Sequence, residues 1–287
     1  MKPLRSPTSA VHIAEGIDHL SAKRQEIIRP ILEHPREYVL LSIRAMAKRL
    51  HTDPATIVRI VRGLGFAGYR DFQYHLHELS LAFATSLDTM QSAGEKATIP
   101  AYIRDSLDQD LKNLHGLKHS LDAPRLVALA KRFHAARRIV VIAGDLAVYL
   151  AHYLEYQIAM LGLPIFAAVS AGRITHMVRT LNGKDLVLAI SFRRGLVQTV
   201  AGAEQARARG AYCVGISDTY LSPLVRECDE VFLASIQSTS FGASYTAPIA
   251  LINAILVACG QYRRPQTLAL LKEIAEEQRK GARWHTA

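Results

Sequence analysis

The chain has 287 residues, of which 49% are hydrophobic and 21% charged, a balance that excludes a disordered protein. Its length is sufficient for two ordinary domains. The longest apolar runs, including 247–258, are too short or interrupted to cross a bilayer, and the absence of an apolar signal-peptide core argues against secretion. Three cysteines without Cys-x-x-Cys spacing predict reduced, mostly buried thiols in a cytoplasmic protein, with neither a disulfide framework nor a zinc site. No cofactor and no bound metal are expected.

The formal net charge is +10, and its distribution along the sequence is informative. A positive charge by itself is compatible with nucleic acid, with a membrane surface or with solubility alone, so its placement matters. Between residues 40 and 70 the only anion is Asp53. The cations of the same region are Arg44, Lys48, Arg49, Arg59, Arg62 and Arg70.

The segment DPATIVRIVRGLGFAGYRDF begins with the signals of a helix start. Asp53 is a good N-cap, and Pro54 suits the first helical position, where no backbone N–H is needed. At about 100° per residue, the larger apolar side chains share one face, whereas Ala55, Arg59 and Arg62 lie on the opposite face. The residues of the apolar face are Ile57, Ile60, Val61 and Leu64.

A second helix pattern precedes this one at 42–50, with only His51 and Thr52 between them. Two short amphipathic helices, a tight turn and a cationic outward face are typical of a helix-turn-helix whose second helix enters the DNA major groove. Small residues at the start of that helix let the backbone approach the bases, and its arginines reach bases or phosphates. We expect DNA contacts from Ser42, Lys48, Arg49, Thr52, Asp53, Pro54, Ala55, Thr56, Arg59, Arg62, Tyr69 and Arg70.

The same segment contains GLGFAG, a literal Gly-x-Gly-x-x-Gly. A dinucleotide-binding loop needs a strand before it and a helix that starts inside it, whereas here a helix runs into it. The glycines are therefore predicted to end the helix, at Gly63 or Gly65, and to shape the following turn. One alternative stays open, in which residues 42–80 form only a helical dimerisation module.

From about residue 124, short apolar runs alternate with helix patterns. Strands are predicted at 137–143, 164–169, 185–191, 211–217 and 230–235, with helices between them. This alternation predicts an α/β fold in which helices cover both faces of a parallel sheet. Ligands of such sheets bind outside the carboxyl ends of the strands. The loops at that edge are 143–147, 191–196 and 217–222.

Several of these motifs resemble the RpiR/MurR family of bacterial transcriptional regulators. The Thr-x-x-Arg of Thr56 and Arg59 and the Leu-Gly-Phe-x-Gly-Tyr at 64–69 are similar to the recognition helix and turn of that family. The second half resembles its SIS (sugar isomerase) domain, with Ser191 at a strand end and Arg-Gly-Ala at 209–211. The resemblance implies a homodimeric or tetrameric regulator that binds palindromic operators in double-stranded DNA and senses a phosphosugar or related metabolite.

Both ligand loops depart from the pattern of that family, Gly-x-Gly-x-Ser followed by Ser-x-Ser-Gly-x-Thr. Here they read AGDLA at 143–147 and SFRRGL at 191–196. Phosphate is still compatible with helix N-terminal amides and the guanidinium of Arg193 or Arg194. A different anion, a ligand with an amine opposite Asp145, or a salt bridge of Asp145 with those arginines at a disused site fits as well. The expected effector contacts are Gly144, Asp145, Ala147, Ser191, Arg193, Arg194, Ser217 and Asp218.

Two other functions stay open. A phosphosugar isomerase would need a positioned general base, but His152 and His176 lie on helix patterns that favour structural histidines, and Glu155 is interpreted as a solvated helix charge. No Ser-His-Asp or metal-ligand cluster is recognisable, so we expect no catalytic residue and no enzymatic activity. A constitutive DNA-binding protein whose α/β half only dimerises is the other alternative.

The expected domain organisation has four parts. They are a helix-turn-helix bundle at 1–80, a helical linker at 81–123, a SIS-like effector-binding and oligomerisation domain at 124–265, and a C-terminal helix and tail at 266–287. Two protomers joined mainly by their α/β halves would present recognition helices to half-sites about one DNA turn apart.

Overall fold

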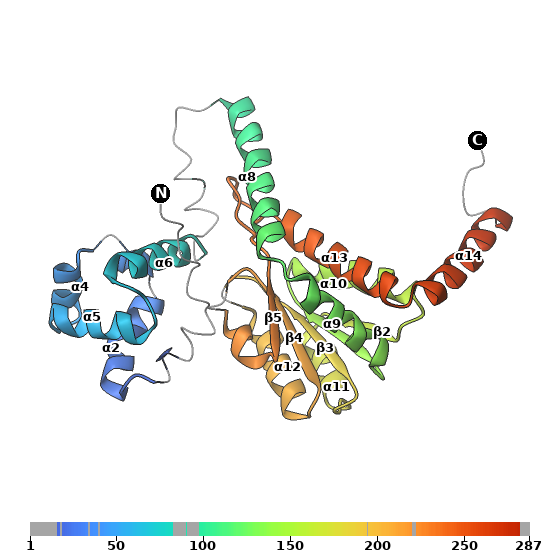
Figure 1. The fold of residues 1–287 in the computed structure, drawn as a ribbon, viewed down its shortest axis with the longest axis horizontal. Helices are drawn as coiled ribbons and strands as arrows, with labels where there is room; N and C mark the ends of the chain where they lie inside the picture. The colour runs from blue at the N-terminus through green and yellow to red at the C-terminus, as the bar shows by residue number, and fades with distance from the viewer. Residues whose placement is uncertain are drawn as a thin grey trace. The chain divides into compact units, whose positions relative to one another are not determined.

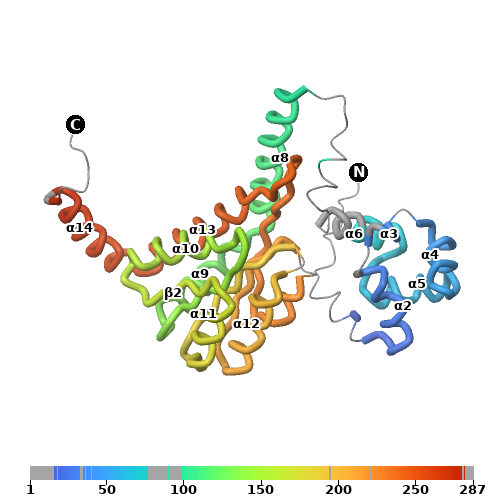
Figure 2. The backbone as a smooth tube through the Cα atoms, turned by 180° about the vertical axis from the view of Figure 1, so that it is seen from behind, coloured from blue at the N-terminus to red at the C-terminus, as the bar shows by residue number. Residues whose placement is uncertain are grey.

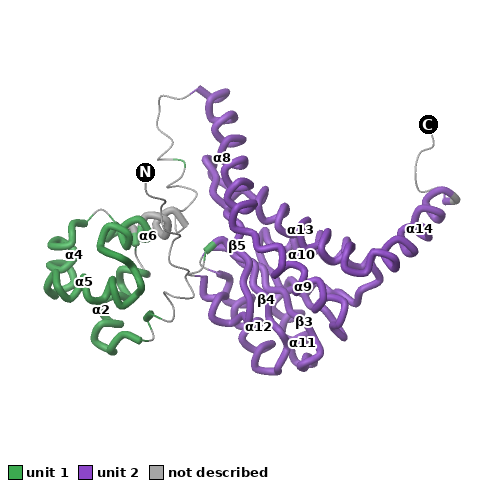
Figure 3. Tube along the Cα trace, in the orientation of Figure 1, with its two compact units in different colours: residues 1–94, 219–221 green, residues 95–218, 222–287 purple. Residues whose placement is uncertain are grey.

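The computed structural model describes residues 16–17, 19–33, 35–39, 41–82, 90, 98–193, 195–219 and 222–281. The chain forms two compact units, one of residues 1–94 with 219–221 and the other of residues 95–218 with 222–287 (Figure 3). The described part of the first unit is helical, and the second unit holds the β-sheet.

Short helices packed around one apolar core build the first unit. They are α2 (Ala22–Glu33), α3 (Pro35–Tyr38), α4 (Ile43–Arg49), α5 (Pro54–Gly63) and α6 (Tyr69–Ala82) (Figure 1). The expected apolar face of α5 is confirmed, because Ile57, Ile60, Val61 and Leu64 are at most 1% exposed. They pack with side chains of the neighbouring helices, including Ile28, Met46 and Phe72.

The second unit is built on a five-stranded parallel sheet, which confirms the expected α/β fold class. Its strands, in the order β2-β1-β3-β4-β5, are β1 (Ile139–Ala143), β2 (Ile165–Ala168), β3 (Leu186–Ile190), β4 (Tyr212–Ser217) and β5 (Glu230–Leu233). Strand β1 pairs on both sides, with Ile139 in register with Ile165 of β2 and Leu186 of β3. The strand order therefore reverses between β1 and β3.

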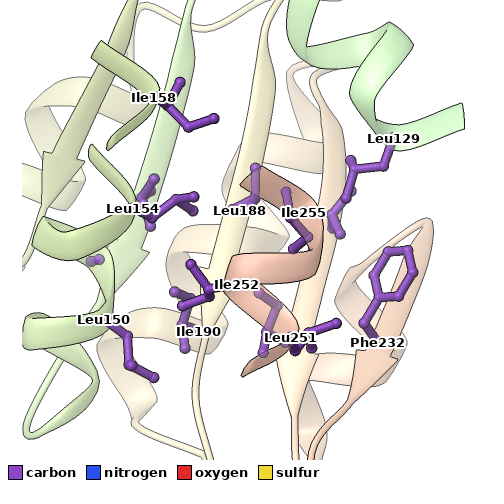
Figure 4. Packing of buried hydrophobic residues seen from close by; sticks show 14 of the residues in the cluster. Leu129, Leu150, Leu154, Ile158, Leu188, Ile190, Phe232, Leu251, Ile252 and Ile255 are labelled. Carbon is purple, nitrogen blue, oxygen red and sulfur yellow. The ribbon is translucent and has the colours of Figure 1, made fainter. Parts of the chain in front are cut away.

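Helices cover both faces of this sheet. One face packs against α9 (Ala123–Ala135), α10 (Ala147–Ala159) and α13 (Thr246–Tyr262). Figure 4 shows how Leu129, Leu154 and Ile255 from these helices meet Leu188 and Ile190 of β3. The opposite face packs against α11 (Ala171–Val178), α12 (Val197–Ala208) and the 3-10 helix η1 (Pro223–Glu227).

Two further helices belong to this unit. The long helix α8 (Ile99–Ser120) lies beside α13, and its N-terminal end projects beyond the sheet (Figures 1 and 2). Helix α14 (Arg264–Lys280) continues the chain after α13 (Figure 2).

A buried ion pair joins the amino ends of β1 and β3. Asp185, whose side chain is 0% exposed, accepts hydrogen bonds from Arg137 Nε at 2.9 Å and Arg137 Nη2 at 2.6 Å. The backbone N–H of Asn182 donates to the same carboxylate at 2.9 Å, and Arg138 Nη2 lies 3.4 Å away. Burial opposes ionisation and raises the pKa of Asp185, but these hydrogen bonds outweigh burial and hold the pKa below its ordinary value.

Replacement of this carboxylate should destabilise the α/β unit. Asp185→Asn leaves two guanidinium groups beside a neutral amide; since both are partly exposed, screening limits the expected loss to about 2 kcal/mol at pH 7. The folded pKa lies below the unfolded one, so the stabilisation is present at neutral pH and is lost as the pH falls below about 4.

Urea unfolding of both proteins at pH 7 and at acidic pH measures this difference. The matched control is Asp105→Asn, the same chemical change on an exposed position of α8. An equal effect of the two substitutions at pH 7 would contradict the assigned role of Asp185.

Candidate functional site

The turn between α4 and α5 has the geometry of a helix-turn-helix. Ser42 caps α4 by accepting the Ala45 N–H at 3.2 Å, and Asp53 caps α5 by accepting the Thr56 N–H at 2.9 Å. The Thr56 hydroxyl also donates to Asp53 at 2.6 Å, and these two bonds lower the pKa of the Asp53 carboxyl. The capping predicted for Asp53 is thus confirmed, with Pro54 at the first turn of α5.

Both helices of the pair end in the same way. In α4, the Thr52 N–H donates to Ala47 O at 2.9 Å, and the intervening His51 has a φ of 49°. In α5, the Phe66 N–H donates to Val61 O at 3.2 Å, and Gly65 has a φ of 89°. This bonding pattern with a left-handed residue is the Schellman motif. GLGFAG therefore ends a helix, as its sequence context predicts, and does not start one.

The outward face of α5 carries the residues expected at DNA. Ala55, Arg59 and Arg62 are exposed, opposite the buried apolar face. Arg59 Nε donates to Ala55 O at 3.3 Å, so the arginine stem lies along its own helix. Ser42, Lys48, Arg49, Asp53, Pro54 and Arg70 are also exposed, whereas Thr52, Thr56 and Tyr69 are half-buried. The role of these residues in DNA contact stays a prediction.

Arg49 and Tyr69, two of the expected contact residues, also bond to other segments of the first unit. Arg49 forms an ion pair with Glu37 of α3, and its guanidinium lies 4.9 Å from the centre of the Tyr38 ring. The Tyr69 hydroxyl donates to Leu41 O at 2.8 Å, and burial raises its pKa to about 12. Both side chains therefore stabilise the position of α4 within the unit.

Sequence reasoning missed Gln73, a third residue that positions α4. Its Nε2 donates to Leu41 O at 2.8 Å, so Leu41 accepts from both Gln73 and Tyr69 just before the Ser42 cap. No short motif marks this contact, because the two partners are far apart in the sequence.

The second group of expected residues lies at the carboxyl ends of β1, β3 and β4. Gly144 follows β1 directly, and a Cβ added there would lie 2.6 Å from Gln198 Nε2 and 2.7 Å from Leu196 Cδ1. The loop after β1 therefore packs closely against the side chains at the start of α12, and these side chains would have to shift if Gly144 were replaced by a larger residue. Ala147 is buried at the start of α10.

Two residues of this edge adopt left-handed backbone conformations that L-residues rarely take. Asp145 has a φ of 54° in the loop after β1, and Arg193 has a φ of 58° in the loop after β3. In the described ranges, His51 of the helix-turn-helix is the only other non-glycine residue with positive φ. Strained backbone of this kind concentrates at functional sites. Asp145 and Arg193 lie in two of the three strand-end loops expected from the sequence, and His51 lies in the predicted turn between the two helices.

The structure brings most of the predicted effector contacts together. The backbone N–H of Arg193 donates to Asp218 Oδ1 at 2.7 Å, and the buried Ser217 lies next to it. Burial raises the pKa of Asp218, and the Arg193 N–H bond opposes that shift. Ser191 Oγ accepts the Leu196 N–H at 2.9 Å, so this hydroxyl holds the loop closed. Arg194 lies outside the described residues.

Tyr245 completes this cluster and was missed by the sequence analysis. Its ring packs edge-on against Phe192, with centroids 5.3 Å apart. Burial raises its pKa to about 12, and the negative charges of Asp145 and Asp218 add to the shift while Arg193 opposes it. Tyr245 precedes α13, far from any strand end in the sequence, so strand-end reasoning could not find it.

A salt bridge between Asp145 and Arg193, one of the alternatives left open by the sequence, is not formed in the part of the chain that the structure describes. The cluster of Asp145, Arg193, Asp218 and Tyr245 thus presents carboxylate, guanidinium and phenol groups at the point where the strand order reverses. Such a switch point is where doubly wound sheets bind ligands.

The residues considered for acid–base chemistry have structural positions. His152 Nδ1 lies 3.1 Å from Glu155 Oε2 on the surface of α10. Glu155 is not a free solvated charge, as the sequence suggested, because Glu155 Oε1 accepts the Ala167 N–H of β2 at 2.7 Å. His176 is exposed on α11. Within the described ranges, no group of three or more His, Cys, Asp or Glu side chains is arranged to hold a metal ion.

Fold and sites together define a two-unit protein in which a helix-turn-helix accompanies a doubly wound α/β fold. Residues 9–82 match the helix-turn-helix domain of the rpiR family, and residues 132–258 match the SIS domain. The chain therefore combines a helix-turn-helix domain of the rpiR type with a SIS domain.

Known proteins of similar sequence and fold share both parts. An uncharacterised HTH-type transcriptional regulator of Haemophilus influenzae is 24% identical over 272 residues, 91% of this chain and 93% of that protein. The HTH-type transcriptional regulator HexR of Escherichia coli is 23% identical over 75% of this chain and 73% of HexR. The Vibrio vulnificus NanR protein, solved in complex with ManNAc-6P, shares the fold with a TM-score of 0.59 and 18% identity, over 95% of this chain and 99% of that one.

Among the described residues, no helix combines the length and the apolar character needed to cross a membrane.

The left-handed backbone of His51 is expected to lower the stability of the first unit. Glycine takes this conformation without steric cost, so His51→Gly should stabilise the first unit by about 0.5–1 kcal/mol, measured by urea unfolding. The matched control is Gly65→Ala at the equivalent position of α5, which should destabilise by about 1 kcal/mol. A loss of stability in His51→Gly would show that the imidazole makes contributions beyond the backbone.

Proposed function

We propose that this protein is a cytoplasmic transcriptional regulator that binds double-stranded operator DNA through α4 and α5 and senses a small anionic metabolite through its SIS domain. The observation that carries the proposal is the exposed face of Ala55, Arg59 and Arg62 on a capped helix directly after a tight turn. Small residues at the start of a recognition helix let its backbone approach the bases, and arginines one turn further along can contact bases or phosphates.

A palindromic operator is expected because helix-turn-helix regulators bind DNA as symmetric dimers. In a two-fold dimer the two α5 helices meet half-sites about one DNA turn apart. The helix-turn-helix domain of the rpiR type and the regulator names of the relatives support this part of the proposal.

The effector is expected to be a sugar phosphate or a related anion. Arg193 lies in the loop that leads into α12, and its guanidinium and the N-terminus of that helix are both groups that favour an anion. NanR, the V. vulnificus protein of the same fold, was solved with ManNAc-6P. Asp145 and Asp218 near the same point favour a ligand that also presents hydroxyl or amine donors.

Effector binding controls transcription only if it favours one arrangement of the two DNA-binding units over another. We expect no isomerase turnover, because His152 and Glu155 are bonded to each other and Glu155 also holds β2. Incubation of the full chain with aldose and ketose phosphates tests this expectation, and turnover lost on substitution of Asp218 would favour an enzyme instead.

Operator binding depends on Arg59 in this proposal. Arg59→Ala should weaken specific binding by about 1–3 kcal/mol if the side chain reads a base. The measurement is a titration of the DNA that flanks the coding region, with excess nonspecific competitor and at two salt concentrations; an operator selected from random DNA serves equally.

Lys23→Ala is the matched control, since it removes an exposed cation of the same unit outside the helix-turn-helix. Equal affinities of Arg59→Ala and the unaltered protein would remove Arg59 from the DNA interface. Loss of all binding in the presence of competitor, also to selected DNA, would refute the regulator.

Effector binding depends on Arg193. Arg193→Asn removes the guanidinium but keeps a residue that tolerates positive φ, and the backbone bond to Asp218 is retained. In thermal shift and calorimetry with a panel of sugar phosphates, we expect at least about tenfold weaker binding, the effect of losing one charge-assisted contact of about 1.4 kcal/mol or more.

Arg179→Asn serves as the control, because Arg179 is exposed after α11, where the chain turns back toward the amino end of β3. If both variants bind the same sugar phosphate equally well, the ligand does not reach the loop after β3. If no anion of the panel binds the unaltered protein, the α/β unit serves oligomerisation only.

A further inference from the structure

The N-terminal half of α8 carries an apolar ridge on its surface. Ile99, Ile103, Leu107 and Leu111 follow one another four residues apart, so they form one continuous row along the helix. Their exposed fractions are 75, 58, 61 and 52%. Single exposed apolar residues are ordinary, but a row of four large side chains marks an interaction surface.

Polar contacts hold α8 to its own unit on a neighbouring side of the helix. Asp110 accepts hydrogen bonds from Ser244 Oγ at 2.5 Å and from Thr246 Oγ1 at 3.0 Å. Asn113 Nδ2 donates to Gln237 O at 2.8 Å. The apolar ridge is therefore not used for these contacts, and it begins at Ile99, the first residue of α8, whose N-terminal end projects beyond the sheet (Figures 1 and 2).

The charges beside the ridge are self-complementary in an antiparallel pair. Arg104 and Asp108 are exposed on the flank away from Asp110. When two α8 helices cross in antiparallel orientation midway between Ile103 and Leu107, the same flank of each helix faces that of the other. Arg104 of one copy then lies beside Asp108 of the other, twice by symmetry. In a parallel pair this flank would instead meet the side that is bonded to its own unit.

We propose that α8 pairs with α8 of a second copy of this chain in antiparallel orientation, through the ridge Ile99, Ile103, Leu107 and Leu111 and the reciprocal Arg104–Asp108 pairs. Rows of i, i+4 residues interdigitate well at a crossing angle of about −50°. The inference rests on the proposed function only in requiring a homo-oligomer. Four side chains cover less than the roughly 800 Å² per partner of a typical stable interface, so the α8 contact is one part of a larger surface between copies.

Two charge-reversal variants of the full chain, measured separately and as a mixture, test the pairing. Arg104→Asp and Asp108→Arg, each alone, place like charges opposite each other and should weaken self-association about five- to tenfold at low salt in sedimentation equilibrium. An equimolar mixture of the two variants restores both opposite-charge pairs between copies and should recover the original affinity. The control Asp105→Arg makes the same charge change on the far side of α8 and should leave the affinity unchanged.

A second variant tests the ridge itself. Leu107→Glu should weaken self-association at least about tenfold, the cost of leaving a charge in an apolar contact, with unchanged circular dichroism. If the first unit of the same chain covers the ridge instead, Leu107→Glu would leave self-association unchanged while protease cleavage between the two units accelerates, which would overturn the proposal. Variants that weaken association but show no recovery on mixing would also overturn it, because the antiparallel pairing would be wrong.

Failure of this inference is distinguishable from failure of the proposed function. A chain that self-associates and binds its operator, yet is insensitive to all α8 substitutions, would refute only the α8 pairing. A chain that is monomeric at every concentration would refute both the pairing and the homo-oligomeric regulator.

Discussion

Burial of β1 and β3 on both faces is the constraint on which the α/β unit depends. All residues of these two strands are apolar and buried, so polar groups are excluded from the middle of the sheet and concentrate at its two edges. At the amino edge, Asp185 and Arg137 fix the two strands by a buried ion pair. At the carboxyl edge, the same two strands deliver Asp145 and Arg193 to opposite sides of the switch point. The amino edge thus stabilises the sheet, whereas the carboxyl edge carries the candidate effector residues.

The fold was predictable because its signals are local. Continuous apolar runs bounded by polar turns predict buried parallel strands, and each expected run contains a strand of the observed sheet. The cap at Asp53 and the helix end at Gly65 follow from residue type alone. The left-handed conformation of His51 does not follow from residue type, because histidine takes this conformation more often than most residues but still rarely. The tight turn between α4 and α5, which pack on one core, accounts for it.

The sites were predictable only in part, because their details depend on contacts between distant segments. Strand ends located Asp145, Arg193 and Asp218 correctly at one edge of the sheet. Tyr245 reaches that edge from the start of α13, and Ser191 uses its hydroxyl to bond the Leu196 N–H within its own loop. No sequence motif marks either contact, because both depend on how the loops and helices fold back onto the carboxyl ends of the strands.

Asp110 gives the candidate effector cluster a mechanical connection. Its carboxylate holds Ser244 and Thr246, the residues on either side of Tyr245, while the Tyr245 ring rests against Phe192 beside the strand ends. A ligand that moved the backbone of Tyr245 would therefore change the two hydrogen bonds by which Asp110 holds α8 to this segment. The carboxylate of Asp110 thus links α8 directly to the segment that carries Tyr245.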